Sequence, residues 1–346
     1  MSGLVQEKKR NVTLADIARE VGVSQALVGK VLGSCSGNIR VSKKTAAIIE
    51  ETAKRLNYRP NLSARILSGQ KSKLIGVLID TQPPPVRFRT LAFLDKYAVA
   101  NGYRILIGEA HDSIDSLYQH YQNFMQYNAD GVICLAHDYP DQADRLRELF
   151  QNVNNIVFVE KPALENAVWV DVDREQATFE LTSLLLEQRK RVGLIAQNPA
   201  YYSIRQRIDG YKRAFRNCGL EMDPSLIRVL QTEDKHLEQQ MARVTEEFIL
   251  PERLDAVIAP NDLCAAYVMR TLMKHNIRIP DQVAIAGFDN EPFAETLYPS
   301  LTSIDDNNEQ IGKSAVQLLL DRIGSTSATE PKFIRVVPKV IRRESI

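Results

Sequence analysis

Residues 13–32 read Thr-Leu-Ala-Asp-Ile-Ala-Arg-Glu-Val-Gly-Val-Ser-Gln-Ala-Leu-Val-Gly-Lys-Val-Leu, and this pattern predicts two short helices joined by a tight turn. Thr13 is placed to cap the first helix, Gly22 to end it and Ser24 to cap the second. Helices joined by so short a turn cross closely, and Ala18 supplies the small side chain that the crossing needs. The spacing is typical of a helix-turn-helix, whose second helix enters the DNA major groove. The alternative is a pair of amphipathic helices without a DNA role.

The next part of the chain predicts two further helices. Residues 42–57 would complete a three-helix core, because their apolar side chains fall on one stripe: Ala46, Ile49, Ala53 and Leu56. Pro60 ends that helix, and Asn61 is placed to cap a short one that runs to Gly69. Because so short a helix is unstable alone in water, we expect it to fold only against a partner chain and DNA.

The charge of the chain is unevenly distributed. Residues 1–73 hold 14 Lys or Arg against 5 Asp or Glu, a net charge of +9, and the other 273 residues carry −8, for a total of +1. A length of 346 residues suits two domains, or three if one is small. A small basic head on a larger acidic body therefore indicates a nucleic-acid-binding module joined to a second function.

Several classes of protein are disfavoured by what the sequence lacks. No apolar run approaches the length of a transmembrane helix, and the first residues lack the apolar core of a secretory signal. The four cysteines and five histidines are scattered, which argues against disulfides and zinc sites and favours the cytoplasm. Gly312-Lys313-Ser314 lacks the upstream glycine of a phosphate loop and is predicted to lie in a packed helix. With no catalytic motif, we expect no enzyme activity, no metal and no cofactor.

Three segments resemble the LacI/GalR family of bacterial transcriptional regulators. They are Val-Thr-Leu-Ala-Asp-Ile-Ala-Arg-Glu-Val-Gly-Val-Ser at 12–24, Leu-Asn-Tyr-Arg-Pro-Asn at 56–61 and Leu-Ile-Gly-Val at 74–77. The resemblance implies an all-α helix-turn-helix domain at 1–59, a hinge helix and linker at 60–72, and a two-lobed effector-binding and dimerisation domain at 73–346. It further implies a homodimer on a pseudo-palindromic operator, with recognition helices in successive major grooves and paired hinge helices in the central minor groove.

The recognition helix departs from the family pattern. Leu27-Val28-Gly29-Lys30 stands where Thr-Val-Ser-Arg is usual, and the loop at 33–40 is longer than usual. Leucine cannot donate to a phosphate, and lysine lacks the bidentate fork that reads guanine. We interpret this as an altered operator preference; the alternative is a head that no longer binds DNA.

The predicted DNA contacts fall into three groups. Gln25, Ala26 and Lys30 are expected to contact bases. Phosphate contacts position the protein without reading sequence, and they are assigned to the basic residues Lys9, Arg10, Lys43, Lys44 and Arg59. By family resemblance, the other predicted contacts are the helix caps Thr13 and Ser24 and the hinge residues Asn61, Ala64, Arg65 and Leu67, with Leu67 wedged into a base step.

From residue 74 onward, apolar runs alternate with amphipathic helical segments. Strands are predicted at 74–79, 103–108, 131–135, 156–159, 168–170, 192–196, 256–259 and 283–288, and helices at 87–101, 113–128, 175–189, 204–218, 235–249 and 262–275. Such alternation gives doubly wound parallel sheets, and so many elements require two lobes. The family resemblance likewise implies an α/β body like periplasmic binding proteins, whose chain crosses between the lobes three times.

Ligands of such folds bind at the carboxyl ends of strands. Polar residues after predicted strands, together with the family resemblance, assign effector binding to Asp80, Glu160, Arg207, Asn261 and Asp289. Helix capping is the alternative for Asn261 and for the neighbouring Asp262. Carboxylates and amides around a guanidinium suit a polyhydroxylated ligand such as a sugar, and the acids would equally suit a cationic or purine-like one.

The sequence therefore predicts a DNA-binding transcriptional regulator, a repressor of a sugar-related operon, controlled allosterically by a sugar between its lobes. Alternatives are a solute-binding-protein-like sensor with a decayed or atypical head, and a regulator that responds to a nucleoside or purine. The final residues lack a leucine heptad, so a dimer is expected rather than a tetramer.

Overall fold

The computed structural model divides into two compact units, residues 1–73 and 74–346, and each is described by itself. The structure describes residues 12–33, 40–59, 66, 69–81, 84–230, 236–324 and 332–346. Within those residues, no helix has the length and apolar character needed to cross a membrane.

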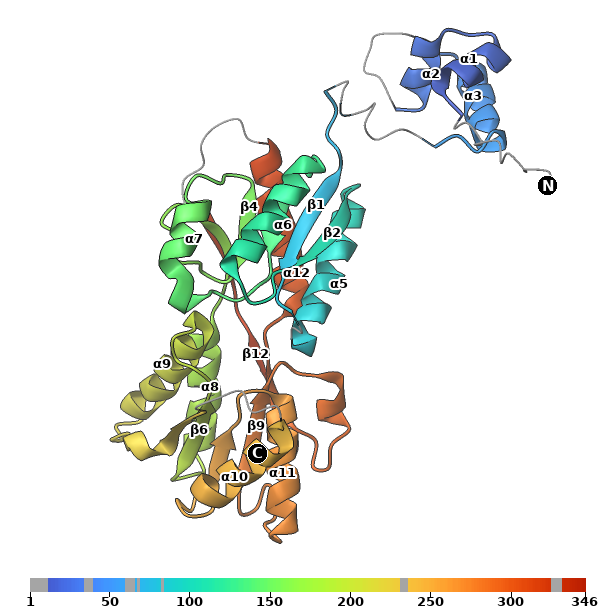
Figure 1. Cartoon of the computed structure of the whole chain (residues 1–346). Coiled ribbons are helices and arrows are strands. Elements are labelled where there is room, and N and C mark those ends of the chain that lie inside the picture. Colours follow the sequence, from blue (N-terminus) through green and yellow to red (C-terminus); the bar gives the residue numbers. More distant parts are fainter. Residues whose placement is uncertain are drawn as a thin grey trace, which may run out of the picture. The chain divides into compact units, whose positions relative to one another are not determined.

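The described residues of the first unit contain α1 (Leu14–Val21), α2 (Gln25–Val31) and α3 (Lys43–Arg55) (Figure 1). Thr13 caps α1 by accepting a hydrogen bond from the Asp16 N–H, while its own N–H donates to the Asp16 carboxylate at 2.9 Å. Gly22 ends α1 with a left-handed φ of 73°, and Ser24 caps α2 through the Leu27 N–H. The buried core consists of Ile17, Ala18, Val28, Ile49 and Ala53. The predicted caps, turn glycine and small crossing residue are confirmed.

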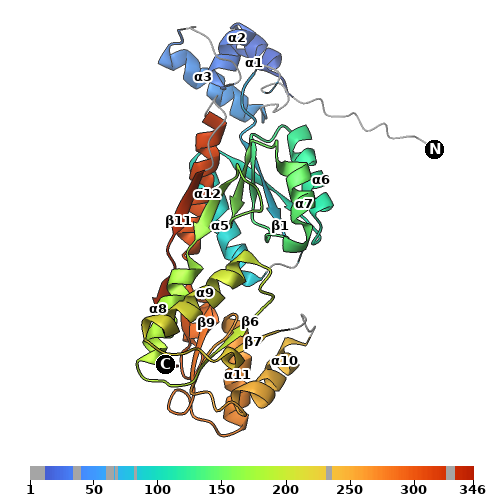
Figure 2. The same cartoon turned by 90° about the vertical axis from the view of Figure 1, so that its left-hand side faces the viewer.

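The second unit has two lobes, each built on a six-stranded sheet. The first sheet has the order β11-β5-β4-β3-β1-β2 and is parallel throughout. Its strands are β1 (Leu74–Ile79), β2 (Arg104–Glu109), β3 (Gly131–Cys134), β4 (Ile156–Val159), β5 (Val168–Val172) and β11 (Lys332–Val336). Helices α5 (Pro85–Ala100) and α12 (Asn308–Gly324) cover one face, and α6 (Ile114–Gln126) and α7 (Ala143–Phe150) cover the other (Figure 2).

The second sheet has the order β12-β10-β9-β8-β6-β7. Its strands are β6 (Val192–Ala196), β7 (Ile227–Val229), β8 (Ala256–Ile258), β9 (Ala284–Phe288), β10 (Thr302–Asp305) and β12 (Lys339–Ile341). The helices of this lobe are α8 (Arg174–Leu186), α9 (Tyr202–Asn217), α10 (Leu237–Val244) and α11 (Asp262–Lys274), and a π-helical turn (Thr245–Ile249) continues α10. Short 3-10 turns lie at Pro140–Gln142, Pro224–Leu226 and Pro292–Glu295.

The chain crosses between the lobes three times, as the family resemblance implied. The crossings follow β5, β10 and β11, because β6–β10 and β12 belong to the second sheet and the remaining strands to the first. In both sheets the carboxyl ends of the parallel strands point towards the crossings. The loops that leave these strand ends therefore meet between the lobes.

The two predicted sheets are confirmed, and they are parallel except at one edge of the second. Edge strand β12 runs antiparallel to β10, with Ile304 opposite Val340. The sequence reading missed β7, β10, β11, β12 and α7. These strands are short or mostly exposed, so their residues lack the continuous apolar run that marks a buried strand.

Candidate DNA-contacting surface and effector site

The first unit presents the start of α2 to solvent. Gln25 and Ala26 are exposed, and Lys30 is half-buried. Val28 is fully buried in the core of this unit, and Ala26 and Lys30, each two residues from it, fall on the other side of α2. The amide of Gln25 can both donate and accept, which is the chemistry that reads a base edge in the major groove.

The predicted phosphate-contacting caps and basic residues that the structure describes in this unit are exposed. Thr13 and Ser24 are exposed at the starts of α1 and α2, where free backbone N–H groups favour a phosphate. Arg59 is exposed after α3, and Lys43 and Lys44 are exposed at its start. The predicted contacts Lys9, Arg10, Asn61, Ala64, Arg65 and Leu67 lie outside the described residues.

A cavity of about 470 Å³ lies between the two lobes of the second unit. The first lobe contributes loops after β1, β2, β3 and β4, and the second contributes the segment from Gln197 to Ile204. Carboxylates dominate its wall: Asp80, Asp112, Asp138, Asp141 and Glu160 line it, beside the basic groups of Arg87 and His137. Of the predicted effector residues, Asp80 and Glu160 lie on this cavity.

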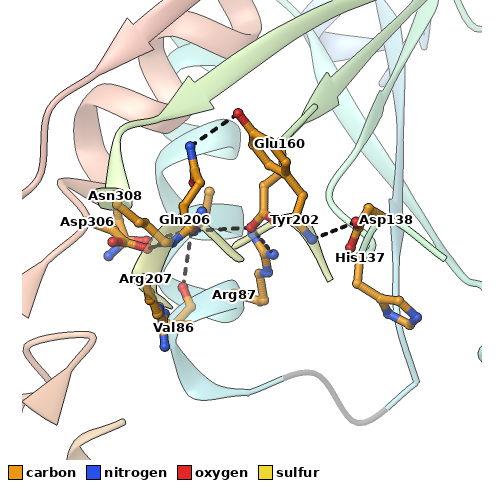
Figure 3. Close-up of polar contacts among 12 residues, drawn as sticks. Val86, Arg87, His137, Asp138, Glu160, Tyr202, Gln206, Arg207, Asp306 and Asn308 are labelled. Atoms are coloured by element: carbon orange, nitrogen blue, oxygen red, sulfur yellow. Dashed lines mark hydrogen bonds and ion pairs between the residues drawn. The ribbon is translucent and has the colours of Figure 1, made fainter. Parts of the chain in front are cut away.

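Glu160 is held by two guanidinium groups (Figure 3). Its carboxylate is buried and contacts Arg87 at 2.6 Å and Arg174 at 3.1 Å. Burial alone would raise the pKa of Glu160, but the charges of Arg174 and Arg87 outweigh it and lower the pKa to about 2. Arg174 also pairs with the buried Asp306 at 2.8 Å. The cluster joins the loop after β4 to the second crossing, so it links the two lobes.

Asp289 is the predicted effector residue whose carboxylate is available to a ligand. Among the described residues, no donor bonds to this carboxylate, although the Arg207 charge lies near. Burial raises the pKa of Asp289 to about 6, with further contributions from Asp306 and Glu291. Asp289 directly follows β9 with a backbone φ of 94°, and Glu160 directly follows β4 with a φ of 88°. The two residues therefore occupy equivalent places in the two sheets. Such positive φ values are strained for residues other than glycine and cluster at functional sites.

Arg207 lies at the edge of this arrangement and does not line the cavity. Its guanidinium stacks 3.9 Å above the Phe288 ring, and Nη1 donates to the Pro260 carbonyl at 2.8 Å. Its Nε is buried and has no partner among the described residues. Burial and the neighbouring charge of Arg174 lower the pKa of Arg207. One donor therefore remains unsatisfied beside Asp289.

Asn261 has the role of a helix cap. Its side chain accepts a hydrogen bond from the Cys264 N–H at 2.8 Å and so begins α11. The neighbouring Asp262, which the sequence reading treated as a cap, is instead fully buried and accepts hydrogen bonds from Ser303 at 2.6 Å and the Glu291 N–H at 2.7 Å. Burial raises the pKa of Asp262 to about 7. Asp262 therefore ties the start of α11 to β10 and to the segment that follows β9.

Direct contacts also join the lobes on two sides. The Asp138 carboxylate of the first lobe accepts a hydrogen bond from the Tyr202 N–H of the second at 2.9 Å (Figure 3). Arg89 on α5 donates to the Asp289 carbonyl and, at 2.7 Å, to the Asn290 carbonyl. Both contacts would change if the lobes opened or closed around a ligand.

One group of cavity residues has the donor types of a metal site. Single ligand atoms of Asp80, Asp112 and His137 lie within 4.8 Å of one another. His137 Nδ1 is 2.7 Å from Asp80 Oδ1, and the Tyr139 hydroxyl donates to the same carboxylate. The polar groups of His137 and Tyr139 therefore bond to the Asp80 carboxylate. Burial opposes the charged form of His137, but the hydrogen bond to Asp80 outweighs it, so the pKa of His137 is raised.

The sequence reading missed several residues of this site. Arg174, Asp306, Arg87, His137 and Asp138 were not predicted. The rule that polar residues follow strands would have found His137 and Asp138, which come shortly after β3, and it would have found Asp306 if β10 had been recognised. No such signal marks Arg87 or Arg174, because each lies in the first turn of a helix.

Two protein-family models match this chain, one in each unit. The model of "Bacterial regulatory proteins, lacI family" matches residues 13–61, and the model of "Periplasmic binding protein-like domain" matches residues 182–346. The first match covers the capped helices and the second covers most of the second lobe.

Individual relatives align with almost the whole chain. The HTH-type transcriptional repressor PurR of Pasteurella multocida (strain Pm70) is 22% identical over 335 residues, covering 96% of this chain and 98% of that protein. A structure of the lac repressor dimer bound to operator and the anti-inducer ONPF is 21% identical with a TM-score of 0.79, covering 97% of this chain and 99% of that one. A complex of the transcriptional regulator CelR with cellobiose is 22% identical with a TM-score of 0.68, covering 97% and 100%. The structural comparisons establish the fold.

Proposed function

We propose that this chain, whose residues 13–61 match the lacI family of bacterial regulatory proteins, is a transcriptional repressor of that family, controlled by a small ligand between the lobes of its body. It acts in the cytoplasm as a homodimer on a pseudo-palindromic operator and has no enzyme activity. The observation that carries this proposal is the pairing of a capped, outward-facing α2 with a cavity at the carboxyl ends of two sheets.

In the DNA-binding role, Gln25, Ala26 and Lys30 contact bases. Thr13, Ser24 and Arg59 contact phosphates, and the hinge segment with Asn61, Ala64, Arg65 and Leu67 enters the minor groove. The head has a net charge of +9, so a dimer brings about twice that charge to the operator. Operator affinity should therefore fall steeply as salt is raised.

In the ligand-binding role, a sugar occupies the cavity and uses Asp80 and Glu160 in its wall as acceptors for its hydroxyl groups. Asp289, Asn261 and Arg207, which do not line the cavity, are the effector contacts proposed for the second lobe. A ligand that contacts both lobes binds more tightly to one arrangement of the lobes than to another. This difference in affinity couples ligand binding in the cavity to DNA binding by the head. A nucleoside is the second candidate, because the cavity carboxylates also accept hydrogen bonds from amino groups.

Selection of operators from a randomised palindrome pool tests the DNA-binding role. The full chain should enrich one half-site pair at moderate salt, and Gln25→Ala should weaken binding to it by about 1–3 kcal/mol. Gln188→Ala, an exposed glutamine on the second lobe, is the matched control and should bind like the wild type. Failure to enrich any site, or equal losses in the two variants, would contradict the proposal.

A thermal-shift screen of the full chain against sugars and nucleosides tests the ligand-binding role. A ligand that binds the folded state alone raises the melting temperature in a concentration-dependent way. Each hit is then added to the operator-binding measurement. A hit that stabilises the chain without changing operator affinity would support a ligand site but refute its coupling to DNA.

A further inference from the structure

A second cavity lies in the first lobe, at the amino ends of β4 and β5. Its volume is about 420 Å³. It is framed by the end of α7, the segments 151–154 and 164–167, and Arg322 near the end of α12. None of its lining residues lines the interlobe cavity, which lies at the opposite ends of these strands. The two cavities are therefore separate.

Arg322 places a half-buried cation in the wall of this second cavity. The inward face of α12 is apolar, with Leu318 and Leu319 fully buried, and Arg322 follows them by one helical turn on the same face. Its Nε donates to the Asn154 carbonyl. Its Nη1 is buried and has no partner among the described residues. A guanidinium carries five N–H donors, and the two on Nη1 have no protein partner in the part of the chain that the structure describes.

The charge of Arg322 is likewise uncompensated. Burial lowers the pKa of Arg322, and no described carboxylate lies close enough to oppose that effect. Burying a cation without a partner is unfavourable unless an anion or water completes the site. A structural role in holding the Asn154 carbonyl accounts for the Nε donor and leaves the buried Nη1 unexplained.

The remaining wall suits an organic anion. Phe150 and Phe158 form an apolar floor, and the exposed amides of Asn152 and Asn166 stand at the rim. Glu165 is the one carboxylate among the residues that line the cavity. A cavity of this volume falls in the range that holds metabolite-sized ligands.

We propose that this cavity binds a small organic anion, whose carboxylate or phosphate pairs with Arg322 and whose apolar body covers Phe150 and Phe158. The site does not depend on the ligand between the lobes or on DNA. It lies about 21 Å along α12 from Asn308, given a rise of about 1.5 Å per residue. Asn308 accepts a hydrogen bond from Thr90 beside the interlobe cluster, so one helix connects the two ligand positions.

The fluorescence of Trp169 gives a local readout. It is the only tryptophan of the chain, and on β5 it pairs in register with Phe158 of the cavity floor. The full chain is titrated with benzoate, phenyl phosphate, inorganic phosphate and benzamide, a neutral isostere of benzoate. We expect benzoate or phenyl phosphate to change the fluorescence saturably, with benzamide binding at least tenfold more weakly. The stronger of the two anions identifies the preferred head group.

Two substitutions should act in opposite directions. Arg322→Gln should weaken binding of the anion about 10- to 100-fold, since a charge-assisted hydrogen bond is lost. Glu165→Gln should tighten it about two- to fivefold, because a like charge is removed from the wall. Glu165 is exposed, so its variant tests the idea even if Arg322→Gln fails to fold. Arg216→Gln, an exposed arginine on α9, is the control and should change nothing.

The outcomes separate clearly. Tighter binding by Glu165→Gln together with weak binding of benzamide supports the anion site. Equal binding of benzoate and benzamide, binding of inorganic phosphate as strong as that of the aromatic anions, or no binding of any probe overturns it.

Discussion

Replacing Glu160 with glutamine tests the ionic cluster between the lobes. Arg174 and Arg87 keep the pKa of this buried carboxyl at about 2, against an ordinary value of 4.5. One pKa unit corresponds to about 1.4 kcal/mol, so this shift corresponds to about 3 kcal/mol of stability at pH 7. Glutamine keeps the size of the side chain but leaves both guanidinium groups without their anion. We therefore expect the free energy of unfolding to fall by about 3 kcal/mol.

The pH dependence gives a second, independent expectation. The folded-state pKa lies below the unfolded one, so the stabilisation is complete above pH 4.5 and is lost as the pH falls towards 2. The glutamine variant cannot titrate at this position. The difference between wild type and variant should thus shrink by about 1 kcal/mol between pH 7 and pH 4.

Urea unfolding followed by Trp169 fluorescence measures both quantities. Trp169 lies on β5, next to β4 in the sheet, so it reports unfolding of the lobe that holds Glu160. Glu109→Gln is the control, because Glu109 is exposed on β2 of the same sheet. A loss below about 1 kcal/mol, a loss equal to that of the control, or a difference that does not change with pH would refute the reasoning.

Three other substitutions, two of them with a control variant, have defined outcomes. A Cβ at Gly210 would lie 2.2 Å from a backbone oxygen of α8, so Gly210→Ala should lower the free energy of unfolding by about 1–3 kcal/mol. Gly324→Ala, where the Cβ meets open space, should show no such loss in the same urea titration. Ser24→Ala removes the cap of α2 and should cost about 1 kcal/mol of helix stability and weaken operator binding in fluorescence anisotropy. Ser42→Ala removes the cap of α3, and an equal loss of operator affinity in that variant would contradict the role of α2. Asp289→Asn should stabilise the body above pH 6 by at most about 3 kcal/mol, because a raised carboxyl pKa lowers stability as the pH rises from about 4 to 6. The same variant should weaken binding of the ligand found in the screen, and unchanged ligand affinity would remove Asp289 from the site.

Much of the fold follows from local patterns in the sequence. The predicted ranges of β1, β4 and β6 match the observed strands, because each is a buried apolar run with clear ends. The head was equally predictable, since Thr13 and Ser24 act on backbone groups within three residues of themselves. Elements whose residues are exposed, such as β11 and β12, carry no such pattern and went unrecognised.

The site was predictable only in part. Residues that directly follow a recognised strand, such as Asp80, Glu160 and Asp289, could be proposed because parallel strands bring their carboxyl ends together. What those residues touch could not be proposed. The sequence left Asn261 open between an effector contact and a cap and treated Asp262 as a cap, whereas the fold makes Asn261 the cap and buries Asp262.

The sequence by itself determined the class of this protein: a basic helix-turn-helix head on an acidic α/β body, with candidate ligand residues at strand ends. The tertiary structure decided which charges meet. Arg174 reaches Asp306 across 132 residues, and Arg89 reaches the carbonyl of Asn290 across 201. Caps and apolar periods act over a few residues and are therefore written in the local sequence. Pairs of buried charges depend on how two lobes come together, and on the low dielectric that this packing creates, so only the folded chain specifies them.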